Sequence, residues 1–502
     1  MSSKNGKLVV LVHGWSVHNT ETYGQLPARL QQAAQERGGL ELDVENIWLS
    51  RYVSFRDEVR LEDISRAFNS AVEHDLRPLL GGGRRFACIT HSTGGPVVRD
   101  WWHRFYLDAG KADACPMSHL IMLAPANFGS ALAQLGKSRL SRIRTWFQGV
   151  EPGTGVLEWL ELGSPESWSL NQRWIDTPDV TAAPAPMFPF VLTGQTIDRK
   201  LYDHVNSYTG EVGSDGVVRV AAANLNASAI ELEQEFSGLD PSAQRVSFRV
   251  NGPKRAQPTA FAILPGRSHS GEDKGILRSI GPHDRQGHPT VAAVVRCLLV
   301  RDSDDYKELC EAFASETEAV VAEERVELPA DFLLADHCQI RDCHTMLVFR
   351  VRDDQGHVVE DFDFLLTAGD ANDPNLLPRG FLTDRQRNQR NRGTVTYFLN
   401  YDVLKGCPEV VDPREGTRPL LRARIAGVEK LGIEVDPHKA SERFFVRYAM
   451  AQVSASREQF EAVIRPHQTT LVDIVLRRMV RDGVLRLTTD HTPKDFADTD
   501  PD

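Results

Sequence analysis

The 502-residue sequence contains no apolar run near the ~20 residues that a membrane-spanning helix requires. It also lacks an excess of positive charge, since 58 Lys and Arg side chains are outnumbered by 69 Asp and Glu. A nucleic-acid binder neutralises phosphates with basic side chains, and a polybasic membrane anchor depends on the same charge. We therefore expect no nucleic-acid partner and no such anchor.

Cysteine is scarce, and its seven positions follow no regular spacing. An odd number of irregularly spaced thiols is typical of a reducing compartment rather than of a disulfide framework. The N-terminal residues lead directly into the short apolar run Leu8–Val12, without the apolar core or cleavage site of a signal peptide. We expect a cytoplasmic protein, with export that needs no cleavable signal as the alternative.

Tryptophan is absent after residue 174, and the charge is divided just as unevenly. Residues 301–502 carry the whole net charge of −11, with 27 basic and 38 acidic side chains, whereas residues 1–300 are neutral. At ~150 residues per domain the length alone suggests about three domains. The two asymmetries favour two regions with different roles.

Between residues 7 and 300, short apolar runs alternate with helical patterns. Such alternation indicates a mostly parallel sheet flanked by helices. The predicted strands are Leu8–Val12, Leu42–Leu49, Phe86–Thr90, Leu120–Ala124, Phe188–Leu192, Val217–Val220 and Phe261–Leu264. The predicted helices are Leu26–Glu36, Ile64–Leu80, Gly95–Leu107 and Thr290–Leu299.

Residues 130–186 interrupt this alternation with a long insertion that holds four Trp amid Gly and Pro. We interpret it as a hinged lid or acyl-chain pocket, with extra core as the alternative. Residues 301–325 are acidic and helical in pattern, which predicts a connector. From about 326 the apolar period becomes two, which predicts a β-sandwich over 326–488. Residues 489–502 have no periodicity and are predicted to be a disordered acidic tail.

The clearest motif is the run from Phe86 to Gly95, Phe-Ala-Cys-Ile-Thr-His-Ser-Thr-Gly-Gly, which predicts a strand, a tight turn and a helix. A Ser at such a turn is exposed at the strand's C-terminal end, and small residues after it let the helix pack closely. The helix N-terminus directs partial positive charge at the place where an oxyanion would form. Ser92 is thus a candidate nucleophile, with helix capping as the alternative.

This turn resembles that of the α/β-hydrolases, in particular the lipase and phospholipase branch that includes bacterial lipases and relatives of GPI inositol-deacylase. Their turn is usually Gly-x-Ser-x-Gly, and Thr90 replaces the first Gly here. Four further segments occur in the family's order: His-Gly-Trp15, Leu-Ala-Pro-Ala-Asn-Phe-Gly-Ser130, Gly-Ser-Asp215-Gly-Val and Arg-Ser-His269-Ser. The resemblance covers residues 7–300, and residues from 326 onward resemble no family.

The resemblance implies an α/β-hydrolase fold over residues 1–300 and acyl transfer in which Ser92 attacks, His269 acts as the base and Asp215 orients it. Backbone N–H groups of Thr93 and of a residue near Trp15 would form the oxyanion hole. The residues leave Asp198 or Asp203 open as alternatives for the acid, and His283 or His288 for the base. Candidate substrate-binding residues in the insertion are Trp159 and Trp168.

We therefore expect a serine carboxylic-ester hydrolase that acts on lipids, a phospholipase or lipase, and a bacterial effector role is one setting for it. Its expected partners are a lipid or ester substrate, a membrane surface contacted transiently, and a protein bound by the C-terminal region. We expect no cofactor and no metal, because the group His337, Cys338, Cys343 and His344 lacks the spacing of a zinc site. The alternatives are a deacylase or esterase of protein-linked or small soluble esters, and a non-catalytic binding or scaffold protein.

Overall fold

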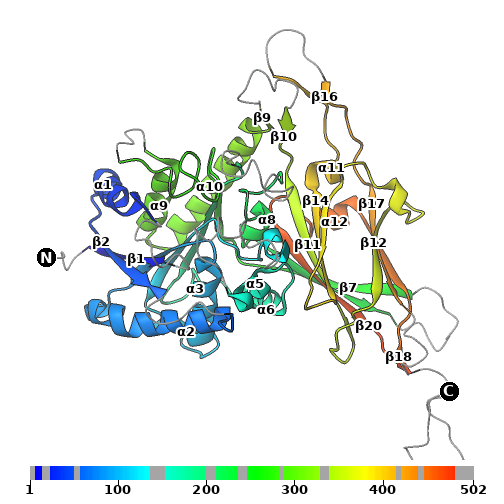
Figure 1. The fold of residues 1–502 in the computed structure, drawn as a ribbon, viewed down its shortest axis with the longest axis horizontal. Helices are drawn as coiled ribbons and strands as arrows, with labels where there is room; N and C mark the ends of the chain where they lie inside the picture. The colour runs from blue at the N-terminus through cyan, green and yellow to red at the C-terminus, as the bar shows by residue number, and fades with distance from the viewer. Residues whose placement is uncertain are drawn as a thin grey trace, which may run out of the picture.

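The computed structural model describes residues 6–13, 23–49, 57–135, 153–197, 211–235, 246–282, 287–327, 338–413, 420–438 and 446–480. Two β-sheets lie side by side, one flanked by helices and the other almost free of them (Figure 1). No helix in these ranges combines the length and the apolar character needed to cross a membrane.

The first sheet has six parallel strands in the order β2-β1-β3-β4-β5-β8. The strands are β1 (Lys7–His13), β2 (Leu42–Trp48), β3 (Phe86–His91), β4 (Met117–Leu123), β5 (Phe188–Thr193) and β8 (Ala260–Ile263). Six of the predicted strands are confirmed. The seventh, Val217–Val220, is wrong, because the N–H groups of Val217 and Val218 donate to the Asp215 carboxylate in a turn instead of to a neighbouring strand.

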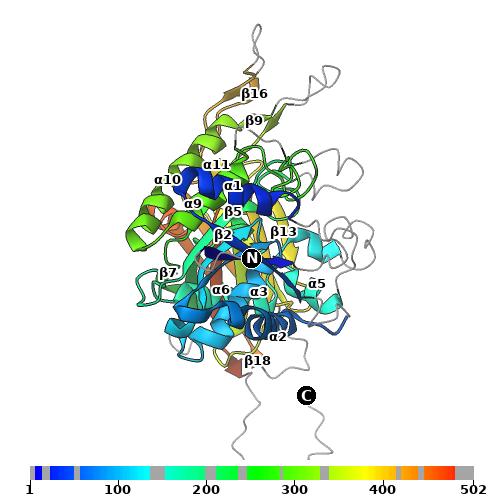
Figure 2. The same cartoon turned by 90° about the vertical axis from the view of Figure 1, so that its left-hand side faces the viewer.

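Helices cover both faces of this sheet (Figure 2). One face is covered by α1 (Leu26–Gly38), α9 (Pro289–Leu299) and α10 (Ser303–Glu323). The other is covered by α2 (Leu61–Ala71), α3 (Gly94–Trp102), α5 (Thr154–Leu160) and α6 (Pro165–Asp176). The predicted helices are confirmed. The segment expected to be a connector is the helix α10, which buries Tyr306, Leu309 and Phe313 in the core of the first sheet.

The second sheet has nine strands in the order β12-β17-β19-β7-β6-β20-β11-β14-β13. The strands are β6 (Ser228–Gln234), β7 (Val246–Arg255), β11 (His344–Asp353), β12 (Phe362–Ala368), β13 (Leu382–Arg387), β14 (Thr394–Asn400), β17 (Lys430–Pro437), β19 (Ala451–Ser456) and β20 (Thr469–Leu476). Shorter elements are α8 (Val220–Ala223), α11 (Tyr401–Lys405), α12 (Arg457–Glu461), β9 (Val326–Glu327), β10 (Gln339–Ile340), β15 (Val410–Val411), β16 (Leu420–Arg422), β18 (Val446–Arg447) and β21 (Met479–Val480).

The second sheet folds into two halves that share one strand. The start of β7 pairs with β19, and the rest of β7 pairs with β6. Side chains from both halves, among them Phe349 of β11 and Phe364 of β12, enclose a common apolar core. The predicted mainly-β sandwich is therefore confirmed as a fold.

Two strands of the second sheet, β6 and β7, come from before residue 300. They enter it because β6 pairs in parallel with β20, some 240 residues later. The sheet also packs its opposite face on the helices of the first one, where Met346, Phe398 and Leu471 join the core that contains Trp174. The predicted division at residue 300 stays a prediction, and residues 489–502 lie outside the described ranges.

Candidate active site

Ser92 lies on the sharp turn between β3 and α3. Its φ of 54° is in the left-handed region, which a non-Gly residue adopts only when its surroundings hold it there. Two hydrogen bonds do so: Ser92 N–H donates to Leu123 O at 3.0 Å, and Ser92 O accepts from Ala126 N–H at 3.3 Å. The turn presents the Ser92 hydroxyl at the C-terminal end of the sheet, as the motif predicts.

Two glycines give this turn the room it needs. A Cβ at Gly95 would lie 2.8 Å from Pro125 Cβ, and a Cβ at Gly94 would lie 3.2 Å from Thr90 Cβ. The second contact explains how Thr90 replaces the glycine that the family usually has before its serine. Position 94 lacks the Cβ atom that would press on the Thr90 side chain, so α3 still packs closely on β3.

Asp215 lies in a buried turn just before α8. Its Oδ1 accepts from the N–H groups of Val217, at 3.0 Å, and Val218, at 2.7 Å. Its own N–H donates to Val218 O at 3.1 Å, which closes the turn. These bonds fix the carboxylate so that Oδ2 is directed at His269, and they satisfy a charge that is wholly buried.

His269 lies in the loop after β8, and the backbone holds that loop tightly. Its N–H donates to Asp215 O at 2.9 Å, and the preceding Arg267 O accepts from Thr196 N–H at 3.0 Å. A Cβ at Gly194 would lie 1.9 Å from Arg267 O, so only glycine lets the end of β5 approach this loop. The His269 ring is therefore placed by the first sheet itself.

The structure brings Ser92, His269 and Asp215 together in one hydrogen-bonded triad. His269 Nδ1 lies 3.0 Å from Asp215 Oδ2, and His269 Nε2 lies 3.2 Å from Ser92 Oγ. A carboxylate only accepts, so it selects the imidazole tautomer that carries its proton on Nδ1. Nε2 then offers a lone pair to the serine hydroxyl, which is the arrangement that activates a serine nucleophile.

Of the four alternative residues, His288 lies within the described ranges, and it takes no part in the triad. His288 is buried as the N-cap of α9, where Nδ1 accepts from Thr290 N–H at 3.2 Å and Nε2 contacts Ser279 Oγ at 2.9 Å. Its ring is therefore occupied by helix capping. Asp198, Asp203 and His283 lie outside the described residues, as does Trp15.

Comparison with solved structures identifies a relative over nearly the whole chain. Phospholipase PlaB from Legionella pneumophila is 41% identical, with a TM-score of 0.81, and the match covers 97% of each chain. The same phospholipase in complex with thio-NAD is 40% identical, with a TM-score of 0.82 and the same coverage of both chains. No family model and no curated protein matches the sequence.

The chain belongs to the PlaB family.

Membership of the PlaB family confirms the predicted α/β-hydrolase fold of the lipase and phospholipase branch and the predicted class of serine ester hydrolase. The similarity also extends over the second sheet, since it covers 97% of this chain. The β-sandwich, which resembled no family on sequence, is therefore a part of the PlaB architecture.

Thr93, predicted to stabilise an oxyanion, directly precedes α3 and is buried beside Ser92. Amide N–H groups at a helix N-terminus have no partner within the helix, so they can bind an anion. The residue expected to donate with it, Trp15, lies outside the described part of this PlaB-family chain.

His91, directly before Ser92 in the sequence, is a neighbour of the triad. Its ring centroid lies 4.9 Å from that of His269, and His91 Nε2 lies 3.3 Å from His269 O. Burial, and then the nearby His269, lower the pKa of His91 to about 3. His91 is therefore a neutral side chain at ordinary pH, and it can contact the base without adding charge to the site.

The two tryptophans predicted to bind substrate are buried in the core beside α3. Trp159 and Trp168 are only 3% and 4% exposed. The guanidinium of Arg350, from β11, lies 4.4 Å from the centre of the Trp168 ring. This packing favours the extra-core alternative for the described part of the insertion. Contact of either indole with substrate stays a prediction.

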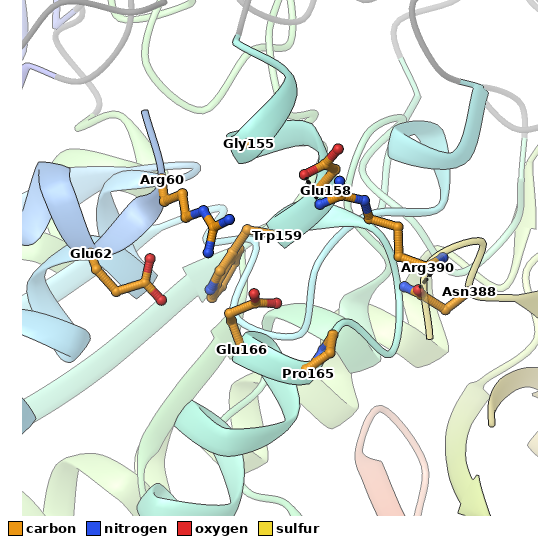
Figure 3. Close-up of a pocket in the computed structure, with 9 residues that line it drawn as sticks. All are labelled: Arg60, Glu62, Gly155, Glu158, Trp159, Pro165, Glu166, Asn388 and Arg390. Atoms are coloured by element: carbon orange, nitrogen blue, oxygen red, sulfur yellow. Dashed lines mark hydrogen bonds and ion pairs between the residues drawn. The ribbon is translucent and has the colours of Figure 1, made fainter. Parts of the chain in front are cut away.

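A polar cleft of about 380 Å³ opens beside Trp159, between α2, α5, α6 and the β13–β14 loop (Figure 3). Five charged side chains line it: Arg60, Arg390, Glu62, Glu158 and Glu166. Arg390 and Glu158 form an ion pair with each other. None of the three triad residues lines this cleft, so it is a feature separate from the triad.

The turn that carries Asp215 is held from the other side by the second sheet. Arg219, fully buried, donates to Glu211 at 2.8 Å and also to Asp384 of β13. Its guanidinium lies 4.2 Å from the centre of the Phe398 ring in β14. Thr469 Oγ1 of β20 donates to Ala221 O at 2.7 Å. The second sheet is thus directly attached to the acid turn.

No metal ligands gather in the described ranges, where no group of three or more His, Cys, Asp or Glu side chains could hold an ion. Cys343 and His344 lie at the start of β11, and His337 lies outside those ranges. The His344 ring is used in hydrogen bonds to Asp342 O at 2.8 Å and Thr383 Oγ1 at 3.1 Å.

Proposed function

We propose that this PlaB-family protein hydrolyses carboxylic esters of phospholipids, with Ser92 as nucleophile, His269 as general base and Asp215 as the acid that orients it. The observation that carries the proposal is the triad, in which His269 Nε2 lies 3.2 Å from Ser92 Oγ and Nδ1 lies 3.0 Å from Asp215 Oδ2. The phospholipid preference rests on the 41% identity with phospholipase PlaB.

The reaction would proceed in two halves. Ser92 Oγ attacks the ester carbonyl while His269 takes its proton, and the resulting oxyanion accepts hydrogen bonds from backbone N–H groups of Thr93 and a residue near Trp15. His269 then protonates the leaving alcohol, which leaves an acyl-serine. Water attacks this ester with the help of His269 and releases the fatty acid and free Ser92. Asp215 stabilises the imidazolium in both halves.

The proposed substrate indicates where the protein acts. Phospholipid esters lie at the boundary between headgroup and acyl chains, so we propose a transient contact with a membrane surface. All seven cysteines are free thiols, which supports a reducing, cytoplasmic environment for the folded protein. The acidic C-terminal region is proposed to meet a protein partner, since it carries the whole net charge of −11.

The test compares the wild type with Ser92→Ala on phospholipid vesicles, triglyceride emulsions and short p-nitrophenyl esters. We expect release of fatty acid from vesicles and a fall of about 10⁴-fold or more in Ser92→Ala. Asp215→Asn should fall by about 10⁴-fold, because an amide in place of the carboxylate favours the wrong imidazole tautomer.

Ser65→Ala is the matched control, since Ser65 is also buried but its hydroxyl donates to Leu61 O and Val97 O in the α2–α3 contact. It should keep its activity. Equal activity of wild type and Ser92→Ala would contradict the proposed nucleophile. Turnover confined to short soluble esters would favour the alternative of a soluble-ester deacylase.

A further inference from the structure

A second cavity, which is apolar, lies far from the triad, inside the β-sandwich. It has a volume of about 350 Å³ and is enclosed by both halves of the second sheet and by α12. Its lining residues come from β12, β17 and β19 on one side and from β6, β7, β11 and β20 on the other. A void of this size is more than twice the ~150 Å³ of an engineered apolar cavity that binds benzene.

The size of the cavity depends on the small side chains of β19. This strand directs Val453 and Ala455 inward, opposite Ile433 and Leu431 of β17. Larger side chains there would fill the space. An unfilled apolar void lowers stability in proportion to its volume, because its lining atoms lose their packing partners. Because the cavity is also partly open to solvent, an apolar ligand can enter it and supply these packing partners.

The interior provides few hydrogen bonds for a polar ligand. Of its polar lining side chains, Ser454 donates to Asn372 Oδ1 at 2.5 Å, Thr470 donates to Val463 O at 3.3 Å, and Gln459 Oε1 accepts from Ser456 N–H at 2.9 Å. The other lining side chains are apolar. A peptide or nucleotide inside would leave its polar groups unsatisfied, which is costly. The part of any occupant that is buried here must be hydrocarbon.

The mouth of the cavity, unlike its interior, is exposed and has a charged side chain beside it. It lies where β7 approaches the segment after α12, since Val250 there is 51% exposed and Pro253 and Ala462 are also exposed. Arg255 of β7 reaches this rim and donates to Ala462 O. A guanidinium at the mouth of a hydrocarbon cavity suits a ligand with an apolar tail and a carboxylate head.

We propose that this cavity binds one long-chain fatty acid, with the tail between the sheet halves and the carboxylate beside Arg255. The identity of the ligand rests on the proposed function, because ester hydrolysis by the triad would release such an acid. The site is separate from the triad, so a molecule of product bound here would respond to the products of membrane hydrolysis without blocking Ser92.

The experiment uses the full chain with Ser92→Ala, so that no turnover occurs, and titrates it with the fluorescent fatty acid cis-parinaric acid. We expect saturable binding. The double variant Val453→Phe/Ala455→Phe, which fills the cavity, should weaken binding by at least tenfold. Leu365→Phe is the matched control, because Leu365 is exposed on the outer face of the same half-sheet, and it should bind as before.

Arg255→Gln separates a free fatty acid from a lysophospholipid. The substitution should weaken the binding of cis-parinaric acid and leave the competition by lysophosphatidylcholine unchanged. If only the lysolipid competed for the site, the assignment of the ligand as a free acid would be overturned. Binding that persists in the filled variant would place the ligand elsewhere and overturn the proposal. Thermal melting shows whether the filled variant folds, and if it does not, the single change Ala455→Phe replaces it. Because binding is measured without turnover, it can fail or succeed independently of hydrolysis.

Discussion

Thr90 replaces the glycine that the family motif usually has before the serine. The fold accommodates it because Gly94 has no Cβ atom. The Thr90 Cβ lies 3.2 Å from where a Cβ at position 94 would lie, so threonine is tolerated before the nucleophile turn as long as position 94 is glycine. The neighbouring Gly95 is held to glycine by Pro125 Cβ, at 2.8 Å. The spacing of the turn thus depends on two glycines that serve different contacts.

Gly95→Ala should destabilise the protein and lower its activity, because the new Cβ would force α3 away from Pro125 and move Ser92 with it. We expect a loss of about 1–3 kcal/mol in the free energy of unfolding, typical of overpacking. The control is Gly81→Ala, whose Cβ would meet nothing within 4 Å. Denaturant unfolding of both variants measures the difference, and equal stability would contradict the tight contact.

At the residue scale, each proposed triad residue could be predicted from the sequence because each lies in a short local motif. Ser92, Asp215 and His269 each follow a strand or turn pattern that can be seen within ten residues. Val217 and Val218 misled the strand prediction, since two consecutive valines favour a strand but here serve to donate N–H groups to Asp215. No sequence pattern near Asp215 indicated that a distant strand would hold the turn that carries it.

At the scale of elements, β6 and β7 are strands of the second sheet that prediction did not find before residue 300. Residues 228–255 lie among the alternating strands and helices of the first sheet in sequence, yet they pair with β20 and β19 in the second. Strand patterns predict which face is buried, but they do not identify the partner strand. The same difficulty hid the cavity, which depends on small side chains in β19 opposite strands from three other parts of the chain.

The contact of β13 with the acid turn predicts that Asp384→Asn lowers kcat by about tenfold or more with little change in KM. Loss of this charge weakens the hold on Arg219, four residues from Asp215, and small displacements of a reacting group are costly. Asp473→Asn is the matched control, because Asp473 pairs with Arg350 and has the same side-chain exposure of 14%.

Steady-state kinetics on vesicles separate kcat from KM for both variants. Asp384→Glu restores the charge and should recover part of the rate. A fall of equal size in Asp473→Asn would mean that general loosening of the second sheet, rather than the acid turn, limits the reaction.

At the scale of the whole molecule, the two sheets are expected to fold as one unit. A chain that ends at residue 327 keeps β6 and β7 but loses β20, the partner of β6. We expect it to aggregate or to unfold without a cooperative transition, and to lose labelling by a fluorophosphonate probe at Ser92. The control is the complete chain cut within residues 328–337, which should stay folded. A folded, labelled fragment would show that the first sheet is independent.

Buried histidines predict that the protein loses stability in acid. His344 and His467 lie in contact at the junction of the sheets, and burial lowers the pKa of each to about 4. The unfolded chain binds these protons below about pH 6.5, so stability falls as the pH drops from 6.5 towards 4. Each group contributes a slope of about 1.4 kcal/mol per pH unit in that window.

Denaturant unfolding between pH 7.5 and 4.5 measures this slope. His467→Asn should reduce the slope by the contribution of one proton. Asparagine tolerates the left-handed φ of 58° at that position. His438 gives the opposite sign, because Asp363 and Asp361 raise its pKa and its protonation favours the folded state in acid. An unchanged slope in His467→Asn would contradict the assignment.

The pairing of β6 with β20 has a consequence for how the enzyme is made. β20, the last of the second-sheet strands that contact the acid turn, leaves the ribosome about 200 residues after His269, which at ~5–20 residues per second takes on the order of 10 to 40 s. Throughout that interval the nascent chain carries all three triad residues without the complete second sheet that contacts the acid turn. On the proposed function, hydrolysis of lipid esters would therefore be delayed until synthesis is nearly complete.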